Sequence, residues 1–158
     1  MKSTEKFNNA IDIQPNKMQK EALKCLEALR NEGREKSLII SATGTGKTIL
    51  CALDVRSFNP NRFLFIVHNE GILNRAKEEF RKVMPHIDEK EFGLLTGKHK
   101  DINARYLFAT IQTLSNNENF KEFAKDHFDY IVFDEAHRSA AATVSYTHLR
   151  AHETGRNL

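Results

Sequence analysis

Residues 37–50, SLIISATGTGKTIL, join a short apolar run to a helical pattern through a turn that contains two glycines. Gly44 and Gly46 allow the backbone to adopt positive φ angles and to pass close to a bound anion. The N–H groups at the start of the following helix would then face a phosphate. Lys47 would reach the β- and γ-phosphates of a nucleotide, and the Thr48 hydroxyl would hold Mg²⁺. This order of strand, glycine turn, GKT and helix predicts a P-loop.

A simpler interpretation of the same stretch is a glycine turn that only connects a strand to a helix. The strict P-loop pattern begins with glycine, and this chain has Ser41 at that position. The strand before the turn and the helix after it nevertheless favour the P-loop. The candidate nucleotide-binding residues of the loop are Thr43, Gly44, Thr45, Gly46, Lys47 and Thr48.

Further apolar runs lie on both sides of the loop and alternate with helical patterns. Four runs are continuous, as expected for strands that are covered on both faces: SLIIS, RFLFIV, RYLFAT and YIVF. A helical pattern over residues 17–33 precedes the first run, and others separate the rest. In the pattern over residues 70–84, one face carries the apolar residues Leu73, Ala76, Phe80 and Val83. Strands that alternate with helices imply βαβ units with right-handed crossovers. We therefore predict an α/β domain with a parallel β-sheet flanked by helices, in which residues 91–97, EFGLLTG, form either a further short strand or a loop.

The run YIVF ends in two acidic residues, Asp134 and Glu135. Ligands of parallel sheets collect at the carboxyl ends of the strands, so this pair is predicted to lie beside the P-loop. Asp134 would hold Mg²⁺ through water, and Glu135 would polarise the attacking water. Two adjacent carboxylates after a strand are, on their own, more often a solvated turn, but a P-loop in the same chain favours the catalytic interpretation.

Length and composition limit the remaining interpretations. The 158 residues fit one domain, and 40% hydrophobic and 28% charged residues are ordinary for a globular chain. A net charge of +3 permits contact with nucleic acid but does not require it. Cys25 and Cys51 lie in separate apolar patterns, which favours buried thiols in a reducing cytosol over a disulfide or a zinc site. We expect a cytoplasmic protein with no membrane partner, because neither a signal peptide nor a membrane-spanning run is present.

Together, these motifs resemble those of superfamily 2 helicases and translocases. SATGTGKT looks like motif I, and DEAH, residues 134–137, spells motif II of the DEAH-box members. Residues 14–23, QPNKMQKEAL, are similar to the adenine-side segment of the branch that contains type III restriction enzymes and UvrB, with Gln19 at the glutamine that reads adenine. The resemblance covers residues 14–142. It implies a RecA-like P-loop NTPase fold, the first of two motor domains, with ATP and Mg²⁺ as cofactors.

The resemblance also implies which residues act on the nucleotide. Lys47 and Glu135 would be catalytic, and Asp134 and Thr48 would hold the metal. His137 of DEAH would couple the γ-phosphate to the partner domain.

Two further segments resemble parts of the family that face nucleic acid. RFLFIVHNEGILNRA resembles motif Ia, and YLFATIQTL resembles a segment that faces the nucleic-acid backbone. The implied contacts are His68, Asn69, Thr110 and Gln112. Alternatively, the first two residues form a helix cap after a strand, and the other two are ordinary polar groups at a strand end.

The end of the chain does not continue the pattern of the family. His148 and His152 are four residues apart, a spacing that suits a metal site, although an exposed helix end is simpler. A third interpretation fits better, because codons for residues 143–154 can spell a string that resembles a transposase adapter used in sequencing libraries, and residues 154–158 fit the bases that follow such an adapter. We therefore expect a polar lead-in at residues 1–13, a truncated first helicase domain at 14–142, and an adapter-derived tail at 143–158 that does not pack against it.

The sequence thus predicts the ATP-binding motor domain of a DNA helicase or translocase, which couples ATP hydrolysis to movement on nucleic acid. DNA is favoured over RNA, and the missing second RecA-like domain of the same parent chain is an expected partner, so this part alone should hydrolyse ATP poorly. The alternative is a P-loop ATPase of another class that acts on protein, as a switch or a chaperone-like module. A third interpretation is an open reading frame without a cellular product.

Overall fold

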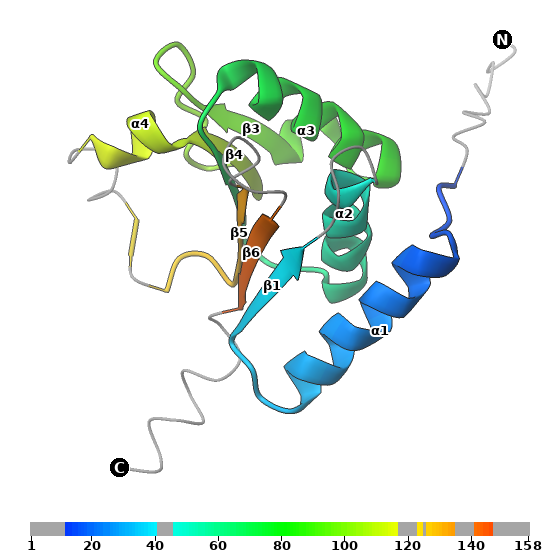
Figure 1. Cartoon of the computed structure of the whole chain (residues 1–158). Helices are drawn as coiled ribbons and strands as arrows, with labels where there is room; N and C mark the ends of the chain where they lie inside the picture. The colour runs from blue at the N-terminus through cyan, green and yellow to red at the C-terminus, as the bar shows by residue number, and fades with distance from the viewer. Residues whose placement is uncertain (1–11, 41–45, 117–122, 125, 135–140, 147–158) are drawn as a thin grey trace, which may run out of the picture.

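In the part of the chain that the structure describes, a six-stranded β-sheet with helices on both faces forms the framework (Figure 1). The computed structural model describes residues 12–40, 46–116, 123–124, 126–134 and 141–146. The strands are β1 (Lys36–Ile40), β2 (Phe63–Val67), β3 (Phe92–Leu95), β4 (Tyr106–Thr110), β5 (Tyr130–Asp134) and β6 (Ala141–Tyr146). The helices are α1 (Lys17–Asn31), α2 (Lys47–Phe58), α3 (Glu70–Val83) and α4 (Ile111–Ser115), with a 3₁₀ turn at Glu89–Glu91. Helices α1, α2 and α3 lie on one side of the sheet and α4 on the other (Figure 1).

The strand order is β1-β6-β5-β2-β4-β3. Strand β2 pairs in parallel with β4 and with β5, and β3 pairs in parallel with β4. The prediction of an α/β fold with a parallel sheet flanked by helices is therefore confirmed. The segment at residues 91–97, which the sequence left open, contributes the edge strand β3.

Strand β6 departs from the predicted topology, because it lies between β1 and β5 and runs antiparallel to both. The predicted domain boundary at residue 142 therefore falls inside a strand. The expectation that the tail does not pack is wrong for residues 143–146. Backbone N–H and C=O groups on the facing edges of β1 and β5 need partners, and a strand can supply them whatever its side chains. The two histidines of the tail, His148 and His152, lie outside the described residues.

The core is built around the aromatic side chains of β2 and its neighbours. Phe63 is fully buried, and its ring lies within 6.5 Å of the rings of Phe65, Phe80, Tyr106, Phe108 and Tyr130. Helix α3 turns its buried residues, Leu73, Ala76, Phe80 and Val83, toward this cluster. These four residues have the helical spacing that the sequence showed.

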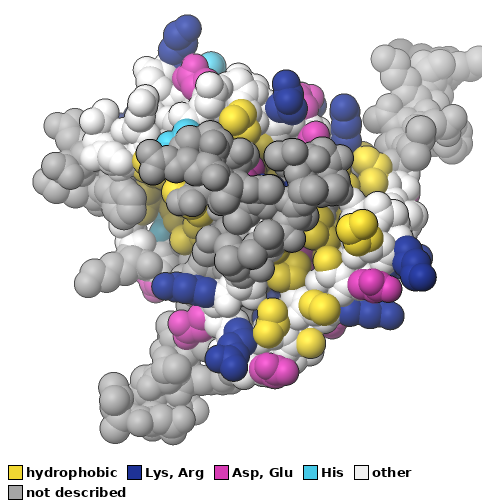
Figure 2. All heavy atoms as spheres, in the orientation of Figure 1, with side chains coloured by type: hydrophobic (Ala, Val, Ile, Leu, Met, Phe, Trp, Pro, Cys, Tyr) yellow, Lys and Arg dark blue, Asp and Glu magenta, His cyan; other side chains and the backbone are white. Residues whose placement is uncertain are grey.

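The two thiols differ in their surroundings. Cys51 is 1% exposed within α2, as predicted, but Cys25 on α1 is exposed, so the prediction of a buried thiol is wrong there. Only one face of α1 packs against the rest of the molecule, and the remainder faces solvent. Figure 2 shows hydrophobic side chains over α1, bordered by charged ones, and Met18 at its start is 67% exposed.

Replacement of Gly93 by alanine tests the packing of the edge strand β3. A Cβ atom there would lie 2.5 Å from the Cβ of Ala104 and 2.7 Å from the Cβ of Asp101. We expect Gly93→Ala to lower the free energy of unfolding by about 1–3 kcal/mol, as measured by urea denaturation. Gly97→Ala is the matched control, because a Cβ there meets nothing within 4 Å. Equal effects of the two substitutions would contradict this packing.

Candidate functional site

Predicted site residues meet at one edge of the sheet. Strands β2, β4 and β5 are parallel and in register, so Val67, Thr110 and Asp134 end at the same edge. Helix α2 begins with Lys47, and Gly46 before it has a φ of 76°, a left-handed conformation that suits glycine. Five predicted site residues lie outside the described residues: Thr43, Gly44, Thr45, Glu135 and His137.

One contact within the site joins a cation to a carboxylate. Lys47 Nζ lies 3.1 Å from Asp134 Oδ1, and the two side chains are 13% and 7% exposed. The pair is electrostatic, since this oxygen is buried and makes no aligned hydrogen bond within the described residues. The start of α2 and the end of β5 are therefore side by side, as the sequence predicted for the P-loop and the acidic pair.

The oxygen atoms of the site suit a magnesium ion. Mg²⁺ in nucleotide sites takes one or two protein oxygens and completes its octahedron with water and phosphate oxygens. Asp134 contributes a buried acceptor without an aligned donor, and the half-buried Thr48 lines the same small hollow. Across the described ranges, no three or more His, Cys, Asp or Glu residues cluster as metal ligands. The donor set thus fits a metal ion that arrives with a nucleotide.

The floor of this hollow is apolar and includes a thiol that the sequence did not single out. Cys51, Phe65 and Val132 line it together with the polar residues. Burial raises the pKa of Cys51 to about 12, and the carboxylates of Asp134 and Asp54 add to the rise, while Lys47 opposes it. The thiol is therefore protonated at neutral pH. The signal for its position was its spacing of four residues from Lys47, which places both on one face of α2.

Gln19 approaches the P-loop from α1. Its Nε2 atom would lie 3.0 Å from a Cβ placed on Gly46. A reciprocal capping box holds the side chain: Asn16 Oδ1 accepts from the Gln19 N–H at 2.8 Å, and Gln19 Oε1 accepts from the Asn16 N–H at 3.0 Å. This cap was not predicted, although N-x-x-Q before an apolar pattern resembles a capping box.

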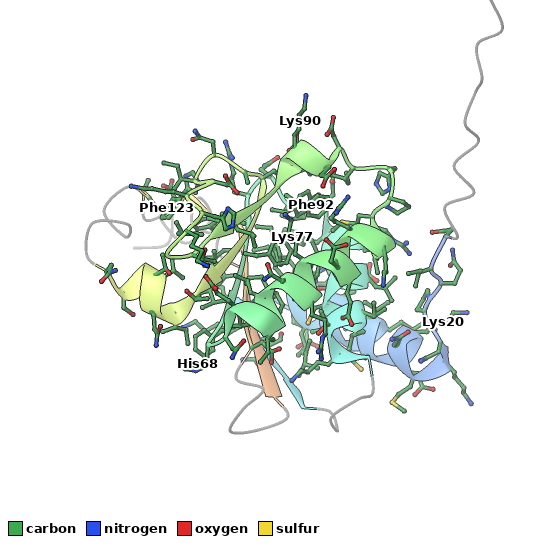
Figure 3. All side chains as sticks on the ribbon, turned by 90° about the horizontal axis from the view of Figure 1, so that it is seen from above. Lys20, His68, Lys77, Lys90, Phe92 and Phe123 are labelled. Carbon is green, nitrogen blue, oxygen red and sulfur yellow. The ribbon has the colours of Figure 1, made fainter. Side chains whose placement is uncertain are left out.

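The predicted nucleic-acid residues lie at the ends of the adjacent strands β2 and β4. Asn69 is the N-cap of α3, and its Oδ1 accepts from the Gly71 N–H at 2.6 Å, so the capping alternative is confirmed for this residue. His68 is exposed near the start of α3 (Figure 3). Thr110 is 6% exposed, with its hydroxyl 2.8 Å from that of Thr113, whereas Gln112 is exposed on α4. Their contact with nucleic acid stays a prediction.

The sequence of this chain is similar to a protein family and to known proteins. The family model described as "Type III restriction enzyme, res subunit" matches residues 12–154. The chain is 30% identical to the Type I restriction enzyme EcoAI endonuclease subunit of Escherichia coli, covering 75% of the chain and 15% of that protein. It is also 30% identical to UvrABC system protein B of Bacillus licheniformis, covering 52% of the chain and 12% of that protein. The chain thus spans less than a fifth of either relative.

Two solved structures share the fold. The UvsW helicase from bacteriophage T4 matches with a TM-score of 0.58 and 19% identity, over 80% of this chain and 44% of that one. A nuclease-deletion mutant of the Type ISP restriction-modification enzyme LlaGI, in complex with a DNA substrate mimic, matches with a TM-score of 0.59 and 22% identity. That match covers 81% of this chain and 16% of the LlaGI chain. No helix within the described ranges has the length and apolar character to cross a bilayer.

Proposed function

Because this chain belongs to the type III restriction enzyme res subunit family, we propose that it binds Mg-ATP and hydrolyses it as a helicase motor domain. Similarity to helicase-family motor domains is common to the family match and both solved structures. The observation that carries the proposal is the 3.1 Å contact between Lys47 Nζ and Asp134 Oδ1. It brings the cation of a GKT turn beside a strand-end carboxylate, the pair that P-loop NTPases use on phosphates and metal.

The role proposed for each residue of the site follows from the chemistry of its side chain. Lys47 binds the β- and γ-phosphates, and the backbone N–H groups at the start of α2 face the same anion. Thr48 and Asp134 would hold Mg²⁺, which would neutralise charge on the phosphates. Glu135, next in the chain after Asp134, positions and polarises the attacking water.

Recognition of the base is assigned to α1. Gln19 offers an amide donor, Nε2, next to Gly46. Its Oε1 already accepts from Asn16, which fixes the orientation of the amide. A preorganised amide presents a donor and an acceptor together, as an adenine edge requires. We propose that this glutamine favours adenine over other bases.

The proposed track for nucleic acid follows the strand ends beside the nucleotide site. His68 and Gln112 are exposed there, Asn69 caps α3, and Thr110 directly precedes α4. The LlaGI structure contains a DNA substrate mimic, which supports DNA as the nucleic acid. Contact with the phosphate backbone would make the binding weaker at higher salt.

Movement along DNA requires more than one gripping surface. We propose that this domain works with a second RecA-like domain, which supplies an arginine to the transferring phosphoryl group. Such an arginine typically contributes about 10³–10⁵ in rate. We therefore assign coupled movement to the two domains together and expect this domain by itself to hydrolyse ATP slowly.

Calorimetric titration of the full chain with ATP tests the central step. We expect saturable binding that requires Mg²⁺ and is weaker for GTP, because the amide of Gln19 matches adenine. No binding in the presence of Mg²⁺ would contradict the proposal. Hydrolysis that increases with added protein, but not with added DNA, would instead favour an ATPase that acts on protein.

A further inference from the structure

A buried carboxylate lies deeper in the molecule than the nucleotide site and is not part of it. Asp54 is on α2, seven residues after Lys47, and is 2% exposed. Its Oδ2 atom accepts a hydrogen bond from Arg30 Nη2 at 2.6 Å and another from the Tyr130 hydroxyl at 2.5 Å. A buried charge is costly unless it is paired and hydrogen-bonded, so these donors determine where Asp54 can lie.

This contact lies at the far end of the helix–strand interface that builds the site. On α2, Lys47 and Asp54 are separated by two turns, about 10 Å along the axis. On β5, Asp134 and Tyr130 are separated by four residues on one face, about 13 Å along the strand. The helix and the strand are therefore joined by one polar pair at the site, Lys47–Asp134, and by a second at the opposite end, Asp54–Tyr130.

The Asp54 carboxylate also binds a residue of α1, the helix that carries Gln19. Arg30 belongs to α1, and its guanidinium lies 4.8 Å from the centre of the Phe58 ring on α2. Phe58 in turn contacts Tyr130 edge to face, with ring centroids 5.2 Å apart. The three elements that carry Gln19, Lys47 and Asp134 thus converge on Asp54.

We propose that Asp54 is a positioning residue, which sets the register of the P-loop helix against strand β5 through Tyr130 and against α1 through Arg30. Cys51 of α2 and Val132 of β5 belong to one apolar cluster. Apolar packing is non-directional and allows a helix to slide. Hydrogen bonds to a buried carboxylate have narrow geometry and do not. The distance between Lys47 and Asp134 is then determined by a contact two helical turns away.

A thiol in the interface reports on this register without any nucleotide. Cys51 lies between the two polar pairs and is 1% exposed, whereas Cys25 is exposed and can be removed by Cys25→Ser. In that background, the rate at which a disulfide reagent labels Cys51 measures local separation of α2 from β5. Urea denaturation of the same variants gives the part of the labelling that global unfolding explains.

Tyr130→Phe removes one donor to Asp54 and keeps the ring. We expect it to raise the labelling rate of Cys51 about ten- to a hundredfold beyond the part due to global unfolding, as a hydrogen bond to a charged group implies. Asp54→Asn, which keeps the shape but removes the charge, should act in the same direction. Tyr106→Phe is the matched control: Tyr106 is 1% exposed at the start of β4 and should leave the excess labelling unchanged.

Two outcomes would overturn the inference. Labelling in Tyr130→Phe that rises only in step with global unfolding would show that the hydroxyl adds stability without setting the register. An equal excess in Tyr106→Phe would show that any buried hydroxyl has the same effect.

A second experiment, on nucleotide affinity, rests on the proposed function. If the register positions Lys47, Tyr130→Phe should also raise the Kd for Mg-ATP by about tenfold, while Tyr106→Phe does not. Excess labelling of Cys51 in a chain that binds no Mg-ATP would support the register and contradict the proposed function. Unchanged affinity in a chain that does bind Mg-ATP would overturn the link to the nucleotide site.

Discussion

We expect Lys47→Ala to lower the affinity of the chain for Mg-ATP by about a hundredfold or more. The ammonium group is the one cation that the described part of the site brings to the phosphates, and each charge-assisted hydrogen bond contributes about 1.5–3 kcal/mol. The substitution also leaves Asp134, 7% exposed at its side chain, without its cationic partner. Isothermal titration calorimetry with Mg-ATP measures the change directly.

The control for this variant removes a lysine of the same charge elsewhere. Lys20 is exposed on α1, close in sequence to Gln19 (Figure 3), and Lys20→Ala should bind Mg-ATP as the unmodified chain does. Circular dichroism and a urea titration of both variants separate lost binding from lost folding. If Lys47→Ala is folded and its affinity is unchanged, the P-loop assignment is wrong.

Glu135→Gln should leave the binding of Mg-ATP intact and slow its hydrolysis by about 10²–10⁴. The amide has the size of the carboxylate but cannot accept a proton from the attacking water, and general-base catalysis contributes a factor of that order. Loss of rate without loss of binding is the signature of an interaction made in the transition state. Because we expect slow hydrolysis from the chain itself, the measurement is a single-turnover assay with protein in excess over labelled ATP.

An exposed carboxylate outside the site provides the comparison. Glu32 follows the last turn of α1, and Glu32→Gln changes the same functional group without an expected effect on the rate. A rate in Glu135→Gln close to that of Glu32→Gln would remove Glu135 from the mechanism. Weaker binding in Glu135→Gln would instead point to a role in holding the nucleotide.

Local sequence patterns correctly predicted several strands and the buried face of one helix, because these features depend on residues close together in the chain. Continuous apolar runs predicted β2, β4 and β5, since a strand buried on both faces has few polar positions. The spacing of Leu73, Ala76, Phe80 and Val83 predicted which face of α3 is buried. The proximity of Lys47 to Asp134 followed from a rule of topology, that parallel strands present their carboxyl ends at one edge.

The predictions that were wrong concern contacts between distant segments. Cys25 has the spacing of a buried position, yet it is exposed because α1 packs through one narrow face. The segment after residue 142 was expected not to pack, yet residues 143–146 pair with β1 and β5. In both cases the outcome depended on which surface the fold left uncovered, and no local pattern records that.

The sequence by itself determined the α/β class, the position of the P-loop and the residue types available for chemistry, because each depends on neighbours within a few positions. Only the tertiary structure decided that Gln19 lies against Gly46, that Asn69 caps α3, and that Asp54 receives donors from two other elements. Asp54 and Tyr130 are 76 residues apart in the chain. A buried carboxylate finds such partners only when helix and strand are packed, because in the unfolded chain water solvates each of them separately.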